Sequence, residues 1–297
     1  MNEQAPKRTL IDLHIHSDKS DGTFSPREIV DIAKAESLNV ISLTDHDTVE
    51  GCREALKYLE SNPEPTLQLI SGIEMSVENK GGTLHILGYH LDIDNNPLLA
   101  TLKELHDIRQ NRNLEIIKKL KQIAIDIDPS ELDSVTSNNI SQGRPHIAKL
   151  MLARGFVESI DQAFDEFLSQ SGKAYVPKKL LPPGETIDLI HNAGGIAVLA
   201  HPATLNRHGV DFEQKLEELI SLGLDGIEVY APLHGQIQVD TYLDLAQKHG
   251  LCISGGSDFH GSVKPQIDIG HCFNHQLLDS SKVSELLMPQ TFPSKQD

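Results

Sequence analysis

The chain has 297 residues, of which 38% are apolar, and this length fits one large α/β domain or one domain that carries an insertion. Its 26 basic residues against 43 acidic residues give a formal charge of −17, which argues against a surface for long duplex nucleic acid. A small anionic substrate stays compatible with this charge, because bound metal ions dominate the electrostatics of a site.

Short strand patterns alternate with helical patterns through most of the chain, and several strand patterns are almost continuously apolar, as in buried parallel strands. The seven expected strands are 9–15, 40–44, 67–72, 84–89, 196–200, 226–230 and 251–255. The expected helices are one starting at Ser25-Pro26 and others near 51–61, 183–192, 212–222 and 241–249. This alternation favours a barrel over an open sheet. The turn residues Asn-Lys-Gly-Gly at 79–82 indicate a hairpin between the third and fourth strands.

The alternation stops between 92 and 175, where a long amphipathic helix pattern is followed by shorter helices near 145–154 and 160–169. We therefore expect a helical insertion, residues 92–175, that lies between the fourth and fifth strands and covers the site. The catalytic barrel would comprise residues 1–91 and 176–288, and residues 289–297 would form a frayed tail.

Histidine and carboxylate side chains gather where the expected strands end. Residues two apart on a strand share a face, so His14 and His16 can bind one metal ion together. A lone histidine such as His85 is more often a packed core residue, but recurrence on six successive strands indicates a metal site at the rim of a barrel. The nine candidate ligands are His14, His16, Asp21, His46, Glu74, His85, His201, Asp258 and His260.

These residues stand in motifs that together resemble a known family. The motifs are His-x-His at 14–16, Asp21, Thr-Asp-His-Asp at 44–47, Gly-Ile-Glu at 72–74, His85, Ala-His-Pro at 200–202 and Ser-Asp-Phe-His-Gly at 257–261. The set resembles the polymerase and histidinol phosphatase (PHP) family of metal-dependent phosphoesterases over most of the chain outside the insertion. The resemblance implies a distorted seven-stranded β/α barrel that holds two or three divalent metal ions.

The same resemblance implies how the ligands are shared. His14, His16, Glu74 and Asp258 would bind one ion; Glu74, His85 and His201 would bind a second, with Glu74 as the bridge; Asp21, His46 and His260 would bind a third. Imidazole and carboxylate ligands without thiolate suit Mn²⁺, Fe²⁺ or Zn²⁺, and we expect Mn²⁺ first. Catalytic roles are implied for Asp21, His46 and His201, and for Arg144 of the insertion.

The insertion contains Gly-Arg-Pro-His-Ile-Ala at 143–148, which resembles a motif of the TrpH-like branch. Members of that branch are similar to nucleoside 3′,5′-bisphosphate phosphatases, and some trim short RNA from its 5′ end, the RNase AM activity. Arg144 and His146 would bind a substrate phosphate, since arginine at a helix start offers paired donors beside backbone amides. The branch often carries a basic residue two places after its His-Pro pair. Here Pro202 is followed by Ala-Thr-Leu at 203–205, and Arg207 or His208 would substitute for the missing basic residue.

The resulting expectation is a phosphatase that removes the 3′-phosphate from nucleoside 3′,5′-bisphosphates, with exonuclease action on the 5′ end of short RNA. The alternatives are a histidinol-phosphate phosphatase, a metal-dependent amidohydrolase and a non-catalytic metal-binding module. The chain offers no nucleophile elbow, P-loop or Cys-x-x-Cys motif.

Cys52, Cys252 and Cys272 are odd in number and suggest reduced thiols. Together with a polar start and no long apolar run, they predict a cytoplasmic location without membrane contact. The sequence leaves the oligomeric state open.

Overall fold

The computed structural model describes residues 8–134, 143–208 and 212–289, and it divides into two compact units. The first unit comprises 1–99 and 181–297, and the second comprises 100–180. The expected tail, 289–297, lies outside the described residues except for its first member.

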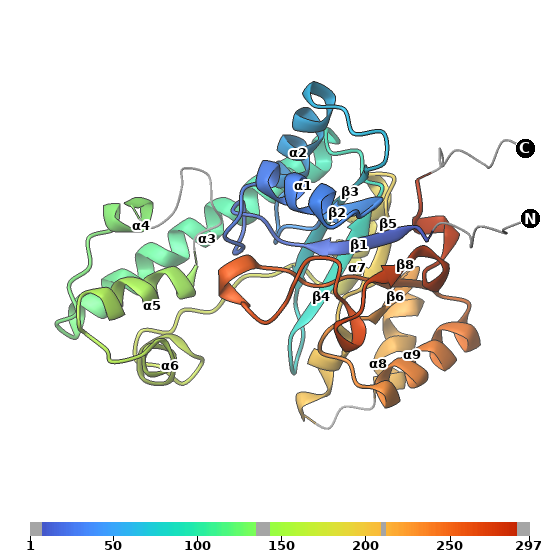
Figure 1. The fold of residues 1–297 in the computed structure, drawn as a ribbon. Coiled ribbons are helices and arrows are strands. Elements are labelled where there is room, and N and C mark those ends of the chain that lie inside the picture. The colour runs from blue at the N-terminus through green and yellow to red at the C-terminus, as the bar shows by residue number, and fades with distance from the viewer. Residues whose placement is uncertain (1–7, 135–142, 209–211, 290–297) are drawn as a thin grey trace, which may run out of the picture. The chain divides into compact units, whose positions relative to one another are not determined.

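The first unit is built on one eight-stranded sheet (Figure 1). In chain order the strands are β1 (Leu10–Ile15), β2 (Val40–Leu43), β3 (Gln68–Val77), β4 (Leu84–Tyr89), β5 (Ile196–Leu199), β6 (Gly226–Tyr230), β7 (Cys252–Gly255) and β8 (Leu278–Asp279). Their order in the sheet is β7-β6-β5-β4-β3-β2-β1-β8. The pairs are parallel except at β4, which is antiparallel to both neighbours, and at β8. The predicted β3–β4 hairpin is therefore confirmed.

The sheet is nearly closed into a barrel, because the chain after β7 pairs with the chain at the end of β1. Ile15 forms a parallel bridge with Phe259, and the amides of His16 and Asp258 donate to the carbonyls of Phe259 and His14 at 2.9 and 2.8 Å. The α/β barrel expected from the sequence is confirmed. The count of seven strands was one short, because β8 has only two residues and pairs with β1 too briefly to leave a periodic pattern.

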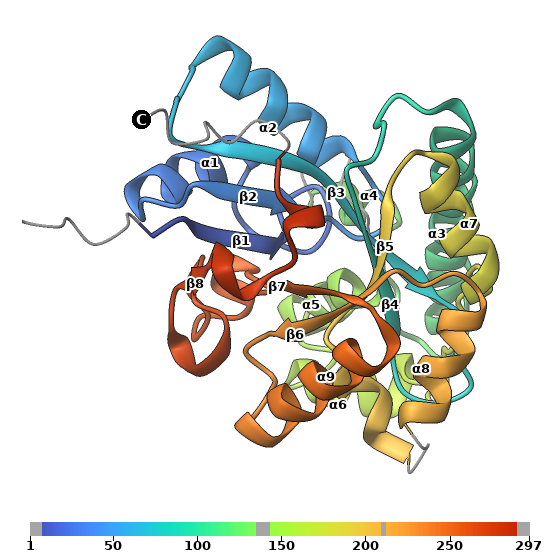
Figure 2. The same ribbon diagram turned by 90° about the vertical axis from the view of Figure 1, so that its right-hand side faces the viewer.

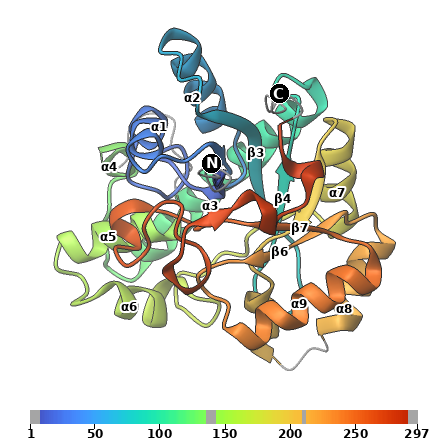
Figure 3. The ribbon, with the colours of Figure 1, turned by 45° about the vertical axis from the view of Figure 1, so that its right-hand side comes forward.

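Helices cover the outside of this barrel. They are α1 (Pro26–Ala35), α2 (Glu50–Ser61), α7 (Pro183–Asn192), α8 (Phe212–Ser221) and α9 (Gln236–His249). Figure 2 shows α1 and α2 beside β1–β3, and Figure 3 shows α8 and α9 beside β6 and β7. The start of α1 is as predicted: Ser25 caps it, Pro26 is its first residue, and Glu28 completes a capping box. The start of α9 lies five residues before the predicted 241.

The second unit is helical. It contains α3 (Asn96–Gln122) from Ala100 onward, α4 (Ser130–Ser134), α5 (Arg144–Ala153), α6 (Ile160–Ala163) and a π-helical turn, η1 (Phe164–Leu168). The single helix predicted for 160–169 is thus an α-turn followed by a π-turn. Residues such as Ile116, Leu120, Ile147 and Met151 are fully buried in a core of its own. An apolar core internal to this segment explains why it separates as a compact unit.

Candidate metal centre

All nine candidate ligands lie at one rim of the barrel, brought there by six strands. His14 lies on β1 and His16 just after it; Asp21 lies in the loop to α1, and His46 follows β2. Glu74 lies on β3, His85 on β4, His201 follows β5, and Asp258 and His260 follow β7. Their nitrogen and oxygen atoms form four overlapping groups that could each hold a metal ion. The groups are His14–His16–Asp258, His14–Glu74–His201, His46–Glu74–His85 and His16–Asp21–His46–His260.

Glu74 is at the centre of this cluster. Its Oε1 lies 2.8 Å from Nδ1 of His85 and 2.8 Å from Nε2 of His201. Its Oε2 lies 3.1 Å from Nε2 of His16, 3.1 Å from Nδ1 of His46 and 3.4 Å from Nε2 of His14. One buried carboxylate therefore faces five imidazole rings, which is the placement expected of a ligand shared between ions.

The pair His14 and His16 faces Asp258. Nε2 of His14 and Nε2 of His16 lie 3.6 and 3.4 Å from Oδ1 of Asp258, and the two nitrogens are 3.1 Å apart. The period of two in β1 turns both rings to the same face, as the sequence predicted. The other oxygen of Asp258, Oδ2, lies 2.5 Å from Nζ of Lys264, a contact that the sequence analysis did not anticipate.

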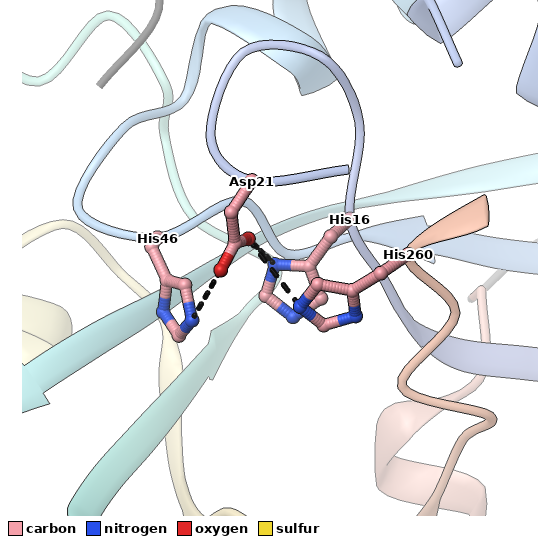
Figure 4. Close-up of side chains that lie close together, drawn as sticks. All are labelled: His16, Asp21, His46 and His260. Atoms are coloured by element: carbon pink, nitrogen blue, oxygen red, sulfur yellow. Dashed lines mark ion pairs between the residues drawn. The ribbon is translucent and has the colours of Figure 1, made fainter. Parts of the chain in front are cut away.

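Asp21 organises the third group, which Figure 4 shows together with its ion pairs. Its Oδ1 lies 3.3 Å from Nε2 of His260 and 3.5 Å from Nδ1 of His16, and its Oδ2 lies 3.7 Å from Nε2 of His46. The resemblance grouped Asp21, His46 and His260, and the structure adds His16 to this group. Nδ1 of His16 faces Asp21, whereas its Nε2 faces Glu74. His16 therefore contacts two of the candidate metal-binding groups, because its ring lies between Glu74 and Asp21.

The pKa values of the cluster follow from burial and from these contacts. Burial lowers the pKa of His16, but Asp258, Glu74 and Asp21 raise it to about 9. Burial lowers the pKa of His46 to about 3, against the opposite effect of Glu74 and Asp21. Burial alone would raise the pKa of Glu74, yet His46, His85 and His14 hold it well below its usual range.

The donor set fits divalent metal ions. Two ring nitrogens such as Nε2 of His14 and Nε2 of His16 repel each other at 3.1 Å unless a proton or a cation lies between them. Nδ1 of His46 is buried and lies 3.1 Å from Oε2 of Glu74, but it forms no hydrogen bond among the described residues. Imidazole nitrogens and carboxylate oxygens without a thiolate suit ions such as Mn²⁺, Fe²⁺ and Zn²⁺.

A buried carboxylate that the sequence analysis missed supports two of the candidate ligands. Glu228 on β6 is 0% exposed; its Oε1 accepts from Nδ1 of His14 at 2.9 Å, and its Oε2 accepts from the amide of His201 at 2.6 Å. His201 has a φ of +24°, a strained conformation that this amide contact stabilises. The available signal was a single charged residue in the apolar strand Gly-Ile-Glu-Val-Tyr.

Two buried aspartates hold the loops of the rim. Asp12 accepts from the amides of Ser257 and Gly270 and from the hydroxyl of Ser257, which joins β1 to the chain after β7. Asp45 accepts from the amide and hydroxyl of Ser17 and from the hydroxyl of Ser20, which joins the end of β2 to the loop of Asp21. These carboxylates fix the backbone that carries the candidate ligands.

The expected substrate residues are on other segments of the chain than the strand ends that carry the nine candidate ligands. Arg144 and His146 begin α5 in the helical unit, where Nδ1 of His146 accepts from the amide of Gly143 at 3.2 Å. Arg207 and His208 lie in a short 3₁₀ segment, Pro202–His208, but their side chains are outside the described residues. Their roles remain predictions.

Comparison with known proteins places the chain in the PHP domain family, whose pattern matches residues 12–220. The chain belongs to this family. It is 34% identical to a 5′-3′ exoribonuclease of Haemophilus influenzae over 84% of this chain and 89% of the relative. It is 31% identical to a 3′,5′-nucleoside bisphosphate phosphatase of Chromobacterium violaceum over 88% of this chain and 90% of the relative.

A solved structure has the same fold. The protein from Bifidobacterium adolescentis, described as a candidate metal-dependent phosphoesterase, superimposes with a TM-score of 0.77 and is 29% identical, covering 91% of this chain and 93% of its own. Within the described ranges, none of the helices has both the length and the apolar character needed to cross a membrane.

Proposed function

We propose that this protein is a metal-dependent phosphoesterase that removes the 3′-phosphate from nucleoside 3′,5′-bisphosphates and also degrades short RNA from its 5′ end. The observation that carries the proposal is the Glu74 carboxylate, which faces the ring nitrogens of five histidines at 2.8–3.4 Å. The two curated relatives named above carry these two activities in their names and match most of the chain.

In this proposal His14, His16 and Asp258 would hold one ion, His85 and His201 would hold a second, and Glu74 would be a ligand shared by both. Asp21, His46 and His260 hold a third, with His16 between the groups. Bound divalent ions supply Lewis-acid activation of water and neutralise charge on the phosphoryl oxygens. We propose two or three ions per chain, with Mn²⁺ as the first candidate.

The protein itself orients the donors and binds the substrate. Glu228 holds His14 with Nδ1 as its donor, so that the lone pair of Nε2 faces the cluster. Arg144 and His146 bind the phosphate of the substrate that is not cleaved, and Arg207 or His208 assists them. Asp21, His46, His201 and Arg144 are the residues we assign to catalysis.

The test is phosphate release by the Mn²⁺-loaded protein from adenosine 3′,5′-bisphosphate, a short RNA oligonucleotide, histidinol phosphate and p-nitrophenyl phosphate. We expect the bisphosphate to be cleaved with the highest kcat/KM, and RNA to lose mononucleotides from its 5′ end. Glu74→Gln serves as the matched inactive variant. Its kcat/KM should fall by more than the roughly 10- to 100-fold typical of losing an outer partner of a metal ligand.

If the protein cleaves histidinol phosphate with the highest kcat/KM, the proposed substrate is wrong, but the assignment as a metal-dependent phosphoesterase stands. A protein that binds Mn²⁺ but cleaves none of the four substrates would support the non-catalytic alternative. Equal activity in Glu74→Gln and the unmodified protein would remove the bridging role.

A further inference from the structure

One cationic side chain contacts the cluster of candidate ligands. Nζ of Lys264 lies 2.5 Å from Oδ2 of Asp258, and in the described part of the chain no other Lys or Arg pairs with any of the nine candidate ligands. The side chain of Lys264 is 33% exposed, whereas that of Asp258 is 9% exposed. This ion pair therefore lies where the buried cluster meets the solvent.

The two oxygens of Asp258 face different partners. Its Oδ1 lies 3.6, 3.4 and 3.4 Å from ring nitrogens of His14, His16 and His260, and its Oδ2 pairs with Lys264. The backbone of Asp258 is also held in place, because its amide donates to the carbonyl of His14 at 2.8 Å and its φ is +53°. One oxygen is thus oriented toward the histidines while the other binds the ammonium group.

The turn that precedes Lys264, η3 (Gly261–Val263), is fixed against the loop between β1 and α1. Gly261 has a φ of +64°, and a Cβ atom there would lie 2.3 Å from Oγ1 of Thr23. The amide of Ser262 donates to the same oxygen at 3.0 Å, and the amide of Lys264 donates to the carbonyl of Gly261 at 3.1 Å. The position of Lys264 over Asp258 is therefore set by a close approach of two loops of the rim.

A lysine is a costly partner for a carboxylate that binds metal. The other buried aspartates of the rim, Asp12 and Asp45, accept from backbone amides and serine hydroxyls, which do not oppose a nearby cation. An ammonium group does oppose it, because like charges repel. Nζ of Lys264 can donate three hydrogen bonds, and Asp258 is its one partner among the described residues. The remaining donors and the positive charge suit an anion that arrives from solvent.

We propose that Lys264 is a catalytic residue that donates to a non-bridging oxygen of the phosphoryl group that is cleaved. This inference deepens the proposed function and rests on it for the reaction. Water attacks phosphorus and the bond from phosphorus to the ester oxygen breaks; one proton of the water ends on the departing alcohol and the other on phosphate. Lys264 keeps its proton throughout and stabilises the negative charge on the phosphoryl oxygens.

The first measurement is the binding of inorganic phosphate to the Mn²⁺-loaded full chain, by calorimetry. We expect Lys264→Gln to bind phosphate roughly 10- to 100-fold more weakly, which is the effect of losing one charge-assisted hydrogen bond. Its kcat/KM should fall by the same factor for adenosine 3′,5′-bisphosphate and for p-nitrophenyl phosphate, because both substrates contain the phosphoryl group that is cleaved.

The second measurement is the Kd for Mn²⁺, obtained by competition with a chelator, and it separates substrate binding from a purely positioning role. If Lys264 only positions Asp258, Lys264→Gln should bind Mn²⁺ roughly 10- to 100-fold more weakly. If Lys264 binds the phosphoryl group, Mn²⁺ affinity should stay the same or rise, because a charge that repels the ion has been removed.

Lys19→Gln is the matched control. Lys19 lies in the loop that also carries Asp21, and its Nζ pairs with Asp18 at 3.2 Å and with Glu54 at 3.0 Å, neither of which is a candidate ligand. Phosphate binding should not change in this variant. Lys264→Arg keeps a cation and should retain more phosphate affinity than Lys264→Gln. If Lys264→Gln does not fold, Lys264→Met removes the charge and keeps the apolar stem.

The proposal is overturned if the unmodified, Mn²⁺-loaded protein does not bind phosphate, or if the neutral variant binds it as tightly. It is also overturned if Mn²⁺ affinity falls together with activity, if Lys19→Gln loses as much as Lys264→Gln, or if only the bisphosphate is cleaved more slowly. The proposed function fails separately, when the unmodified protein cleaves none of its substrates, and phosphate binding would still test Lys264.

Discussion

At the scale of single residues, the fully buried carboxylate of Glu228 is stabilised by hydrogen bonds from two neighbouring residues of the rim. Glu228 is 0% exposed, and it has no Lys or Arg partner among the described residues. Both of its oxygens are used, by His14 and by the strained His201. Because each contact orients a residue proposed to bind metal, Glu228 is a positioning residue that does not itself face substrate.

We predict that Glu228→Gln weakens Mn²⁺ binding by roughly 10- to 100-fold, the usual effect of losing an outer partner of a metal ligand. The amide can keep one acceptor but cannot accept from both His14 and His201. The measurement is the Kd for Mn²⁺, obtained by competition with a chelator.

The control for this change is Tyr89→Phe. Tyr89 is also fully buried in the barrel, and its hydroxyl contacts the carbonyl of Leu13 and the side chain of Ser254, but no candidate ligand side chain. This variant should keep the Mn²⁺ affinity of the unmodified protein. If the two variants lose affinity equally, Glu228 only supports the fold.

At the scale of elements, the site depends on how the chain after β7 meets β1. Gly256 follows β7, and a Cβ atom there would lie 2.3 Å from Cβ and 2.4 Å from the backbone nitrogen of His14. Backbone atoms of β1, which is paired with β2 and with β8, cannot move aside easily. The glycine therefore allows the close approach that brings Asp258 and His260 to the histidines of β1.

We expect Gly256→Ala to destabilise the protein by about 1–3 kcal/mol, as overpacking of a filled interior does. Because the displaced atoms belong to His14, Mn²⁺ affinity should fall as well. Urea unfolding and metal titration measure the two effects. Gly250→Ala is the comparison, since a Cβ there meets nothing within 4 Å and any cost comes from its φ of +67° alone.

If Gly256→Ala and Gly250→Ala lose the same stability and both keep Mn²⁺ affinity, the close approach of β7 and β1 does not shape the site.

At the scale of the whole molecule, the cluster links stability to pH and to metal. The pKa of His16 in the folded chain is about 9, raised from the ordinary 6.5 against the effect of burial, by Asp258 and Glu74. A raised folded pKa gives stability that is fully present below about pH 6.5 and is lost as the pH rises through about 9. A metal ion must displace the same proton, so its affinity changes in the opposite direction.

We therefore predict that the Tm of the metal-free protein falls between pH 6.5 and 9, by about 2–4 °C for each kcal/mol lost. The rise in Tm caused by Mn²⁺ should grow over the same range. Thermal unfolding in EDTA and in Mn²⁺ at a series of pH values measures both. In His16→Gln the fall should become smaller; an unchanged profile would assign the effect to other groups.

The local features of this protein were determined by its sequence. The spacing of His14 and His16 fixes two rings on one face of β1, and the Ser25–Glu28 capping box fixes the start of α1, because both depend on backbone periodicity within a few residues. The recurrence of histidine and carboxylate after successive strands indicated one cluster, since parallel strands deliver their ends to one rim.

Only the tertiary structure determined the contacts between residues that are far apart in the chain. Glu228 contacts His14 across 214 residues, and β1 pairs with β8, a strand of two residues that is too short to carry a periodic signal. Burial and partner choice are set by packing between distant segments, and this is why a one-dimensional pattern indicated the candidate ligands but not the residues that hold them in place.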